Sequence, residues 1–138
     1  MFASRIKKNY LDVKDDSRTI ADIWISYARE YLGETDYLKN RKINVNYNRW
    51  ATEVDDRKQI ASQLKVEFSD AGIDEVKTEG GGSSFDGTNL SGQASQMDVL
   101  NRWKSCSNDP SYKRLFENRE VIEYSERIFG HIPGTECL

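Results

Sequence analysis

The sequence predicts a mainly α-helical protein of four principal helices with a small two-stranded β element, and an all-α fold is the close alternative. Apolar residues recur every three or four positions through most of the 138-residue chain, which is the period of a helix. Alternation every second residue, the period of a half-buried strand, is clear only in residues 42–48. The chain holds only two prolines, so little of it is stiff linker.

The N-terminal part is expected to hold a short helix in residues 1–13 and a longer helix over residues 16–33. Asp16 or Ser17 can cap the start of the longer helix, and Gly33 stands where a helix end prefers a left-handed residue. The predicted inward stripe of this helix comprises Ile20, Ile23, Trp24, Tyr27 and Tyr31.

Residues 42–48 are predicted to form a strand, because apolar residues alternate there with asparagines. A helix over residues 50–71 follows, with Gly72 as its left-handed cap; the stretch "LKVEF" inside it alternates and leaves an extended conformation open. A second short strand in residues 73–79 would pair in parallel with the first through a right-handed crossover.

Two further helices are predicted in the C-terminal part. The first begins where Ser95 and Asp98 stand in a capping-box relation. The second begins with Asp109 as cap and Pro110 at the first helical position, and it ends at Gly130. Together these features predict a mainly helical C-terminal part.

A glycine-rich loop in residues 79–92 is predicted to be a flexible joint in a single domain, residues 1–138. It would connect an N-terminal helix/strand module (1–78) with a C-terminal helical pair (93–130). The loop contains five of the nine glycines but no lysine or arginine, which a phosphate-binding loop would need. A connector is therefore favoured over a ligand site.

Composition narrows the function classes. The formal net charge is −3, and the N-terminal 50 residues are the basic part of the chain. The two cysteines are too few and too far apart for a zinc site. No apolar run is long enough to span a membrane, and the N-terminus lacks the apolar run of a signal peptide, so a cytoplasmic protein without metal or other cofactor is expected.

Cations and aromatic residues interleave in residues 37–50. Such a pattern can hold phosphates and stack bases, so binding of a nucleic acid or nucleotide is an alternative function. The alternative is a purely structural role, in which the aromatic residues belong to the core and the cations lie on the solvent-exposed surface around it. The residues assigned to the binding alternative are Lys39, Arg41, Lys42, Tyr47 and Arg49.

A second alternative is a magnesium-dependent nuclease. Asp74, Glu75 and Lys77 stand in the order acid, then Glu-x-Lys, in which two carboxylates would hold Mg²⁺ and the lysine would stabilise charge. Such triplets are common by chance, and the adjoining strand would offer little apolar sequence. The sequence therefore favours a protein without catalytic activity.

The main prediction is a non-enzymatic interaction protein, such as a small adaptor, assembly or accessory subunit. Abundant tyrosine, tryptophan and arginine suit protein interfaces. Tyr37 and Tyr124 are the candidate contacts with a protein partner or with another copy in a homo-oligomer. The Asn- and Lys-rich, proline-poor composition is compatible with an AT-rich phage or bacterial source.

Overall fold

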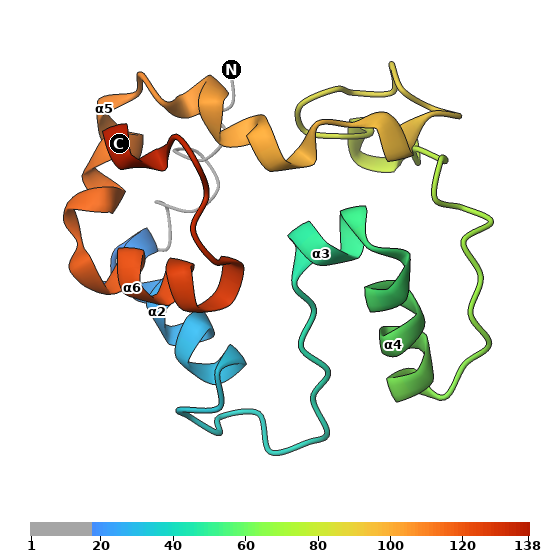
Figure 1. The fold of residues 1–138 in the computed structure, drawn as a ribbon, viewed down its shortest axis with the longest axis horizontal. Coiled ribbons are helices and arrows are strands. Elements are labelled where there is room, and N and C mark those ends of the chain that lie inside the picture. The colour runs from blue at the N-terminus through green and yellow to red at the C-terminus, as the bar shows by residue number, and fades with distance from the viewer. Residues whose placement is uncertain (1–17) are drawn as a thin grey trace. The chain divides into compact units, whose positions relative to one another are not determined.

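The computed structural model describes residues 18–138, so the predicted helix in residues 1–13 and the predicted caps Asp16 and Ser17 lie outside the described residues. The described chain is mainly helical, which confirms the predicted fold class (Figure 1). No sheet forms within residues 18–138, where the one β interaction is an isolated bridge between Ser83 and Gly87. The all-α alternative therefore also fits.

Contacts divide the chain into two compact units. The terminal unit contains residues 18–44 of the described chain together with Trp103–Leu138, and the central unit is Val45–Arg102. This division differs from the predicted modules 1–78 and 93–130. The reason is that the helix Ile20–Tyr31 packs on the helix Arg119–Phe129 rather than on elements close to it in sequence.

The first helix of the terminal unit, α2 (Ile20–Tyr31), begins at a capping box. The Thr19 hydroxyl accepts from the Asp22 N–H at 3.2 Å, and Asp22 accepts from the Thr19 N–H at 2.7 Å. These two hydrogen bonds satisfy backbone groups that would otherwise lack partners. Gly33, with φ of +76°, follows the helix as its sequence position predicts.

The predicted C-terminal helix is divided in two. Asp109 caps α5 (Pro110–Lys113) as expected, and the 3₁₀ helix η4 (Arg114–Glu117) follows. Asn118 then takes an extended conformation and its side chain accepts from the Glu120 N–H at 2.9 Å, so it caps α6 (Arg119–Phe129). An asparagine side chain competes with helical backbone bonds in this way, which is why the helix restarts there.

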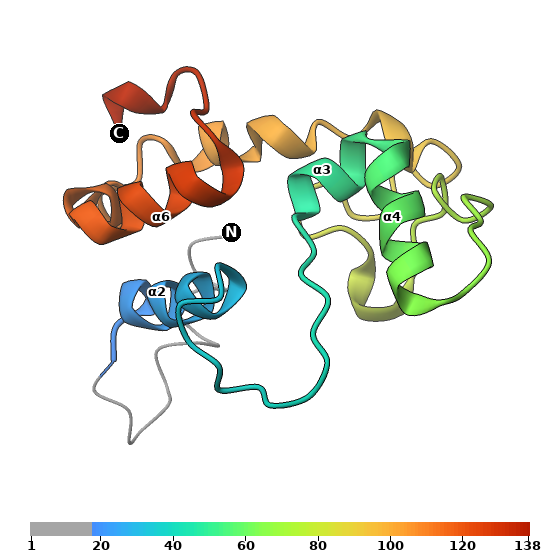
Figure 2. The same cartoon turned by 60° about the horizontal axis from the view of Figure 1, so that its bottom comes forward.

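The core of the terminal unit lies between α2 and α6, which run side by side in Figures 1 and 2. Ile25 and Ala28 from α2 meet Val121 and Tyr124 from α6. The predicted stripe is therefore right only in part: Trp24 packs against this core, but Tyr27 is exposed. Ile25 and Ala28, which the stripe did not include, are buried instead. The 3₁₀ helix η5 (Thr135–Cys137) closes the chain.

The central unit begins where a strand was predicted. Asn46 is extended and buried, and its side-chain oxygen accepts from the N–H groups of Asn48 and Arg49, at 3.1 and 3.3 Å. It thereby caps α3 (Tyr47–Thr52). The alternation of residues 42–48 thus leads into a helix cap instead of a strand, because asparagine at this position satisfies the first turn of a helix.

The remaining elements of the central unit are short. An extended Glu53 separates α3 from α4 (Val54–Leu64), and Lys65 ends α4 with a left-handed φ of 61°. The residues of "LKVEF" after Leu64 are therefore not helical, and residues 73–79 form no strand. Three 3₁₀ helices complete the picture: η1 (Glu79–Gly81), η2 (Ala94–Gln96) and η3 (Val99–Cys106), of which η3 continues past the end of the unit.

A candidate partner-binding groove

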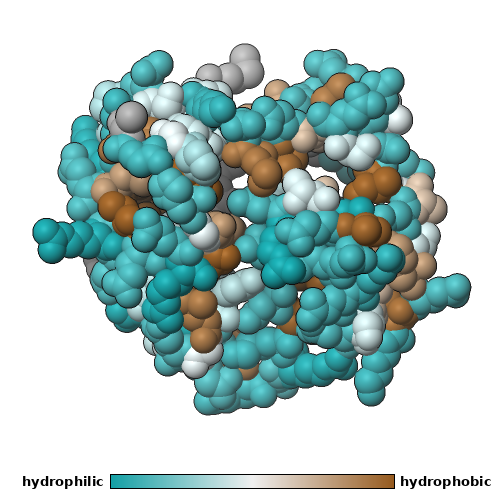
Figure 3. Space-filling model, in the orientation of Figure 1, coloured by the Kyte–Doolittle hydropathy of each residue, from teal (hydrophilic) through white to brown (hydrophobic). Residues whose placement is uncertain are grey.

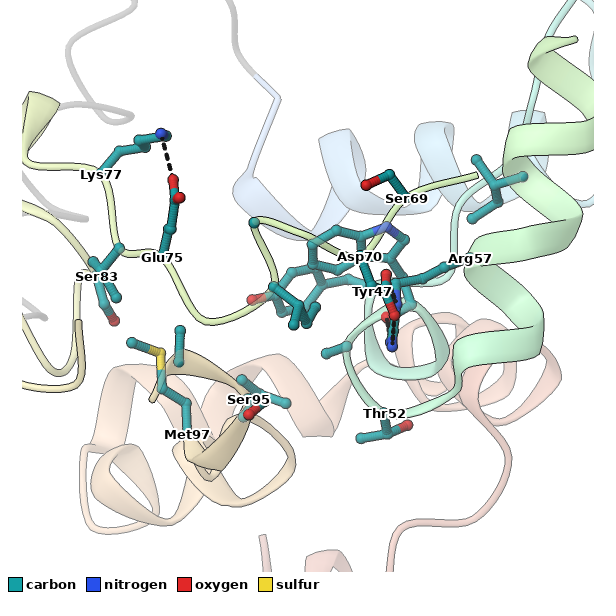
Figure 4. A pocket seen from close by; sticks show the side chains of 18 of the residues that line it. Tyr47, Thr52, Arg57, Ser69, Asp70, Glu75, Lys77, Ser83, Ser95 and Met97 are labelled. Atoms are coloured by element: carbon teal, nitrogen blue, oxygen red, sulfur yellow. Dashed lines mark hydrogen bonds and ion pairs between the residues drawn. The ribbon is translucent and has the colours of Figure 1, made fainter. Parts of the chain in front are cut away.

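A cavity of about 1070 Å³ lies entirely within the central unit. Its walls come from α3, α4, the segment after α4, the glycine-rich loop and residues 94–102. Figure 4 shows side chains from these segments turned toward one another around it. The apolar and aromatic side chains that line this groove include Tyr47, Trp50, Ile60, Leu64, Val66 and Phe85.

Part of the apolar lining of the groove is open to solvent. Five of its large side chains are exposed, from 37% at Trp50 to 58% at Val66, whereas others such as Ile60 and Phe68 are half-buried. Among the described residues of the central unit, Ala61 is the one buried apolar residue. Figure 3 shows such apolar side chains interrupting an otherwise hydrophilic surface. The central unit therefore places its apolar side chains around a cavity and buries almost none of them in a core of its own.

Arg57 connects α4 with the segment that follows it, which also lines the groove. Its guanidinium donates to both carboxylate oxygens of Asp70, at 2.9 and 2.8 Å, and to the backbone oxygen of Trp50 at 2.8 Å. These bonds hold the pKa of Asp70 below its ordinary value and raise the pKa of Arg57. The bidentate pair, drawn in Figure 4 beside Tyr47, holds the segment around Asp70 against α4.

The glycine-rich loop, predicted as a flexible connector, forms a closed turn in the groove wall. Ser83 and Gly87 exchange two backbone hydrogen bonds, at 2.9 and 2.8 Å. Arg102 donates to Asp86 at 2.9 Å and lies over the Phe85 ring, 4.9 Å from its centroid. Gly82 has a φ of +79°, and a Cβ there would stand 2.5 Å from the Gly87 oxygen. This turn accepts only glycine at that position.

The central unit is acidic. Residues 45–102 contain six Lys/Arg and ten Asp/Glu, for a net charge of −4. Within the groove, Arg57 is paired with Asp70, and Lys77 is paired with Glu75 at 2.8 Å. Glu67 and Glu79 also line it, and neither makes an ion pair with a described residue. The charge left after pairing is therefore negative.

The residues predicted to bind nucleic acid are divided between the two units. Lys39, Arg41 and Lys42 belong to the terminal unit, whereas Tyr47 and Arg49 belong to the central unit. Most of the cations already have carboxylate partners. Lys39 pairs with Asp36 at 3.3 Å, Lys42 with Glu30 at 2.6 Å, and Arg49 with Asp56 at 3.0 Å; Tyr47 stacks on Trp50, with centroids 5.8 Å apart.

The predicted nuclease residues do not converge. The Asp74 carboxylate accepts from the Ser95 N–H at 3.1 Å and from its hydroxyl at 2.5 Å, which lowers the pKa of Asp74. Glu75 faces Lys77 instead, as Figure 4 shows. Nowhere in the described chain do three His, Cys, Asp or Glu side chains gather as a metal ion would require.

The two predicted contact tyrosines differ sharply in exposure. Tyr37 is 75% exposed, whereas Tyr124 is 7% exposed and belongs to the core. The Tyr124 hydroxyl donates to Glu34 at 2.8 Å and accepts from the Arg29 Nε–H at 3.0 Å. Of the two, only Tyr37 is open to a surface contact, because Tyr124 joins α2 to α6.

Glu30, a buried carboxylate on α2, has a role that the sequence analysis did not predict. It accepts from the Thr35 hydroxyl at 2.6 Å, the Tyr37 N–H at 3.0 Å, the Leu38 N–H at 3.1 Å and the Lys42 ammonium at 2.6 Å. These bonds lower the pKa of Glu30 from its ordinary value of 4.5 to about 2, the one from Lys42 contributing most.

Comparison with protein-family descriptions, characterised proteins and solved structures finds no match to this chain. No helix in residues 18–138 has the length and apolar character that crossing a bilayer requires.

Proposed function

We propose that this is a non-enzymatic, cytoplasmic interaction protein whose central unit binds an apolar, basic segment of a protein chain in its groove. The observation that carries the proposal is the partly open apolar lining: five of its large side chains are between 37% and 58% exposed, in a unit whose described residues include one buried apolar residue. Exposed apolar surface of this kind marks sites where proteins associate.

The chemistry of the groove defines the segment that fits it. Stacked Tyr47 and Trp50 are the kind of rigid aromatic anchors that dominate binding energy at interfaces. Glu67 and Glu79, together with the net charge of −4 of the unit, favour lysine or arginine beside the apolar contact residues. The Arg57–Asp70 pair holds two of the lining segments together before binding, which reduces the conformational entropy lost on binding.

Selection from a displayed library of random peptides tests this proposal. We expect the wild-type protein to enrich peptides in which two or three apolar residues lie beside lysine or arginine. Leu64→Asp places a charge in the lining and should weaken the selected peptides about tenfold or more. Val54→Asp is the matched control, because Val54 is an exposed valine of the same helix that does not line the groove.

Two outcomes of the peptide selection would contradict the proposal. If the wild-type protein enriches no peptide, or if the enriched peptides bind Leu64→Asp as tightly as wild type, the groove does not bind protein segments. Circular dichroism of each variant confirms that the helices are intact. The nucleic-acid alternative predicts instead that a labelled single-stranded oligonucleotide binds at low salt and dissociates steeply as salt rises.

A further inference from the structure

The terminal unit displays a segment with the chemistry that the groove requires. Tyr37 and Leu38 are adjacent, and they are 75% and 60% exposed. Three cations, Lys39, Arg41 and Lys42, lie within the next four residues. Two solvent-facing apolar side chains beside cations match the chemistry of the groove, and here they lie in the same chain as the groove.

Glu30 holds this segment in one conformation. Its carboxylate binds the backbone N–H groups of both Tyr37 and Leu38, while their side chains project into solvent. The same carboxylate binds the Lys42 ammonium at 2.6 Å, so both ends of the segment are fixed to α2. Much of the ordering that a flexible peptide would undergo on binding is therefore already complete.

Charge also matches between the segment and the groove. Arg41 is exposed and makes no ion pair with a described residue, and Lys39 has one exposed partner, Asp36. Glu67 and Glu79 in the groove are likewise without ion pairs to described residues. Contact between the segment and the groove would pair these opposite charges, and their attraction would speed the association of the two surfaces.

We propose that the protein binds a second copy of itself, with Tyr37 and Leu38 of one copy seated in the central-unit groove of the next. This inference rests on the proposed function and names the partner of that same groove. The two surfaces are different, so the contact is heterologous: each joined pair retains one free segment and one free groove. Assembly therefore continues into a closed ring or an open chain of copies.

Sedimentation velocity over a concentration series tests the proposal on the full chain. We expect the mean mass of the wild-type protein to rise with concentration. The variant Tyr37→Ala/Leu38→Ser removes the apolar side chains of the segment, and Leu64→Asp places a charge in the groove. Each variant alone should remain a monomer. An equimolar mixture of the two variants should form a dimer and stop there, because only one intact segment and one intact groove can meet. Val54→Asp should assemble like wild type.

Several results would overturn the inference. A wild-type protein that stays monomeric at every concentration excludes self-association, as does a mixture of the two variants that remains monomeric. A dimer that survives in either variant alone shows a different interface. The peptide selection separates these failures from failure of the proposed function, since a monomeric protein whose groove still enriches basic, apolar peptides binds a segment from another protein.

Discussion

The Tyr124 hydroxyl on α6 donates to Glu34, just beyond the end of α2, at 2.8 Å. The same oxygen accepts from Arg29, and Arg127 binds Glu34 at 2.6 Å. Both arginines also lie over the Tyr124 ring, with distances to its centroid of 5.7 and 5.3 Å. One buried tyrosine therefore joins two helices that are separated by some 90 residues in sequence.

Removing only this hydroxyl should weaken the pairing of α2 with α6. Tyr124→Phe keeps the ring in the core but leaves Glu34 and Arg29 without their shared partner, so the melting temperature should fall. Tyr27→Phe is the matched control, because the Tyr27 side chain is exposed, and it should melt like wild type. Thermal unfolding followed by circular dichroism measures both. Equal melting of the two variants would contradict a stabilising role for the Tyr124 hydroxyl.

Truncation of the core between these helices should have a larger effect. Ile25 is buried against α6, and Ile25→Ala should lower the free energy of unfolding by about 2–5 kcal/mol, through lost burial and the cavity left behind. Ile122→Ala removes the same atoms from an exposed position on α6 and should cost much less. Urea denaturation of both variants gives the comparison, and similar losses would place Ile25 outside the core.

The pKa of Glu30 predicts how stability depends on pH. The pKa of Glu30 is lowered to about 2 in the folded protein from its ordinary 4.5, so its ionised carboxylate stabilises the fold at pH values above about 4.5. That contribution should disappear as pH falls from about 4.5 toward 2, because the unfolded chain takes up a proton at Glu30 in this range while the folded protein does not. Melting temperatures across this window should fall less steeply for Glu30→Gln than for wild type. Glu126→Gln, at an exposed position, should follow the wild-type curve.

Gly82 offers a test of the closed turn in the groove wall. Gly82→Ala places a Cβ 2.5 Å from the Gly87 oxygen at a φ of +79°, so the paired bonds between Ser83 and Gly87 should break. We expect faster proteolytic cleavage within residues 79–92. Gly72→Ala has open space and no unusual φ, and its cleavage rate should match wild type. An unchanged rate in Gly82→Ala would mean that the turn is already open in solution.

Local signals in the sequence predicted several element ends correctly. Asp109 and Pro110 begin α5, and Gly33 and Gly130 follow α2 and α6. These signals succeed because caps depend on neighbouring residues only. The breaks at Glu53 and Asn118 were missed, since the helical period of apolar residues continues across both positions.

The groove could be predicted only in part, for a related reason. Trp50, Val54, Ala61, Leu64 and Phe68 recur at helical spacing in the sequence, and all of them except Val54 line a common space. Periodicity reports which face is apolar, but it does not report whether another element covers that face. The role of Glu30 was equally hidden, because its partners are backbone N–H groups, which every residue other than proline carries.

The order of segments along the chain allows the two units to unfold separately. The terminal unit is made from both ends of the described chain. The central unit is a continuous segment, connected to the terminal unit in sequence at Val45 and at Arg102. The central unit is thus anchored at both of its ends, so it can unfold locally while α2 and α6 stay paired. Amide hydrogens of the two units should therefore exchange with solvent as two separate populations, the slower one belonging to the helices that contain Ile25 and Val121.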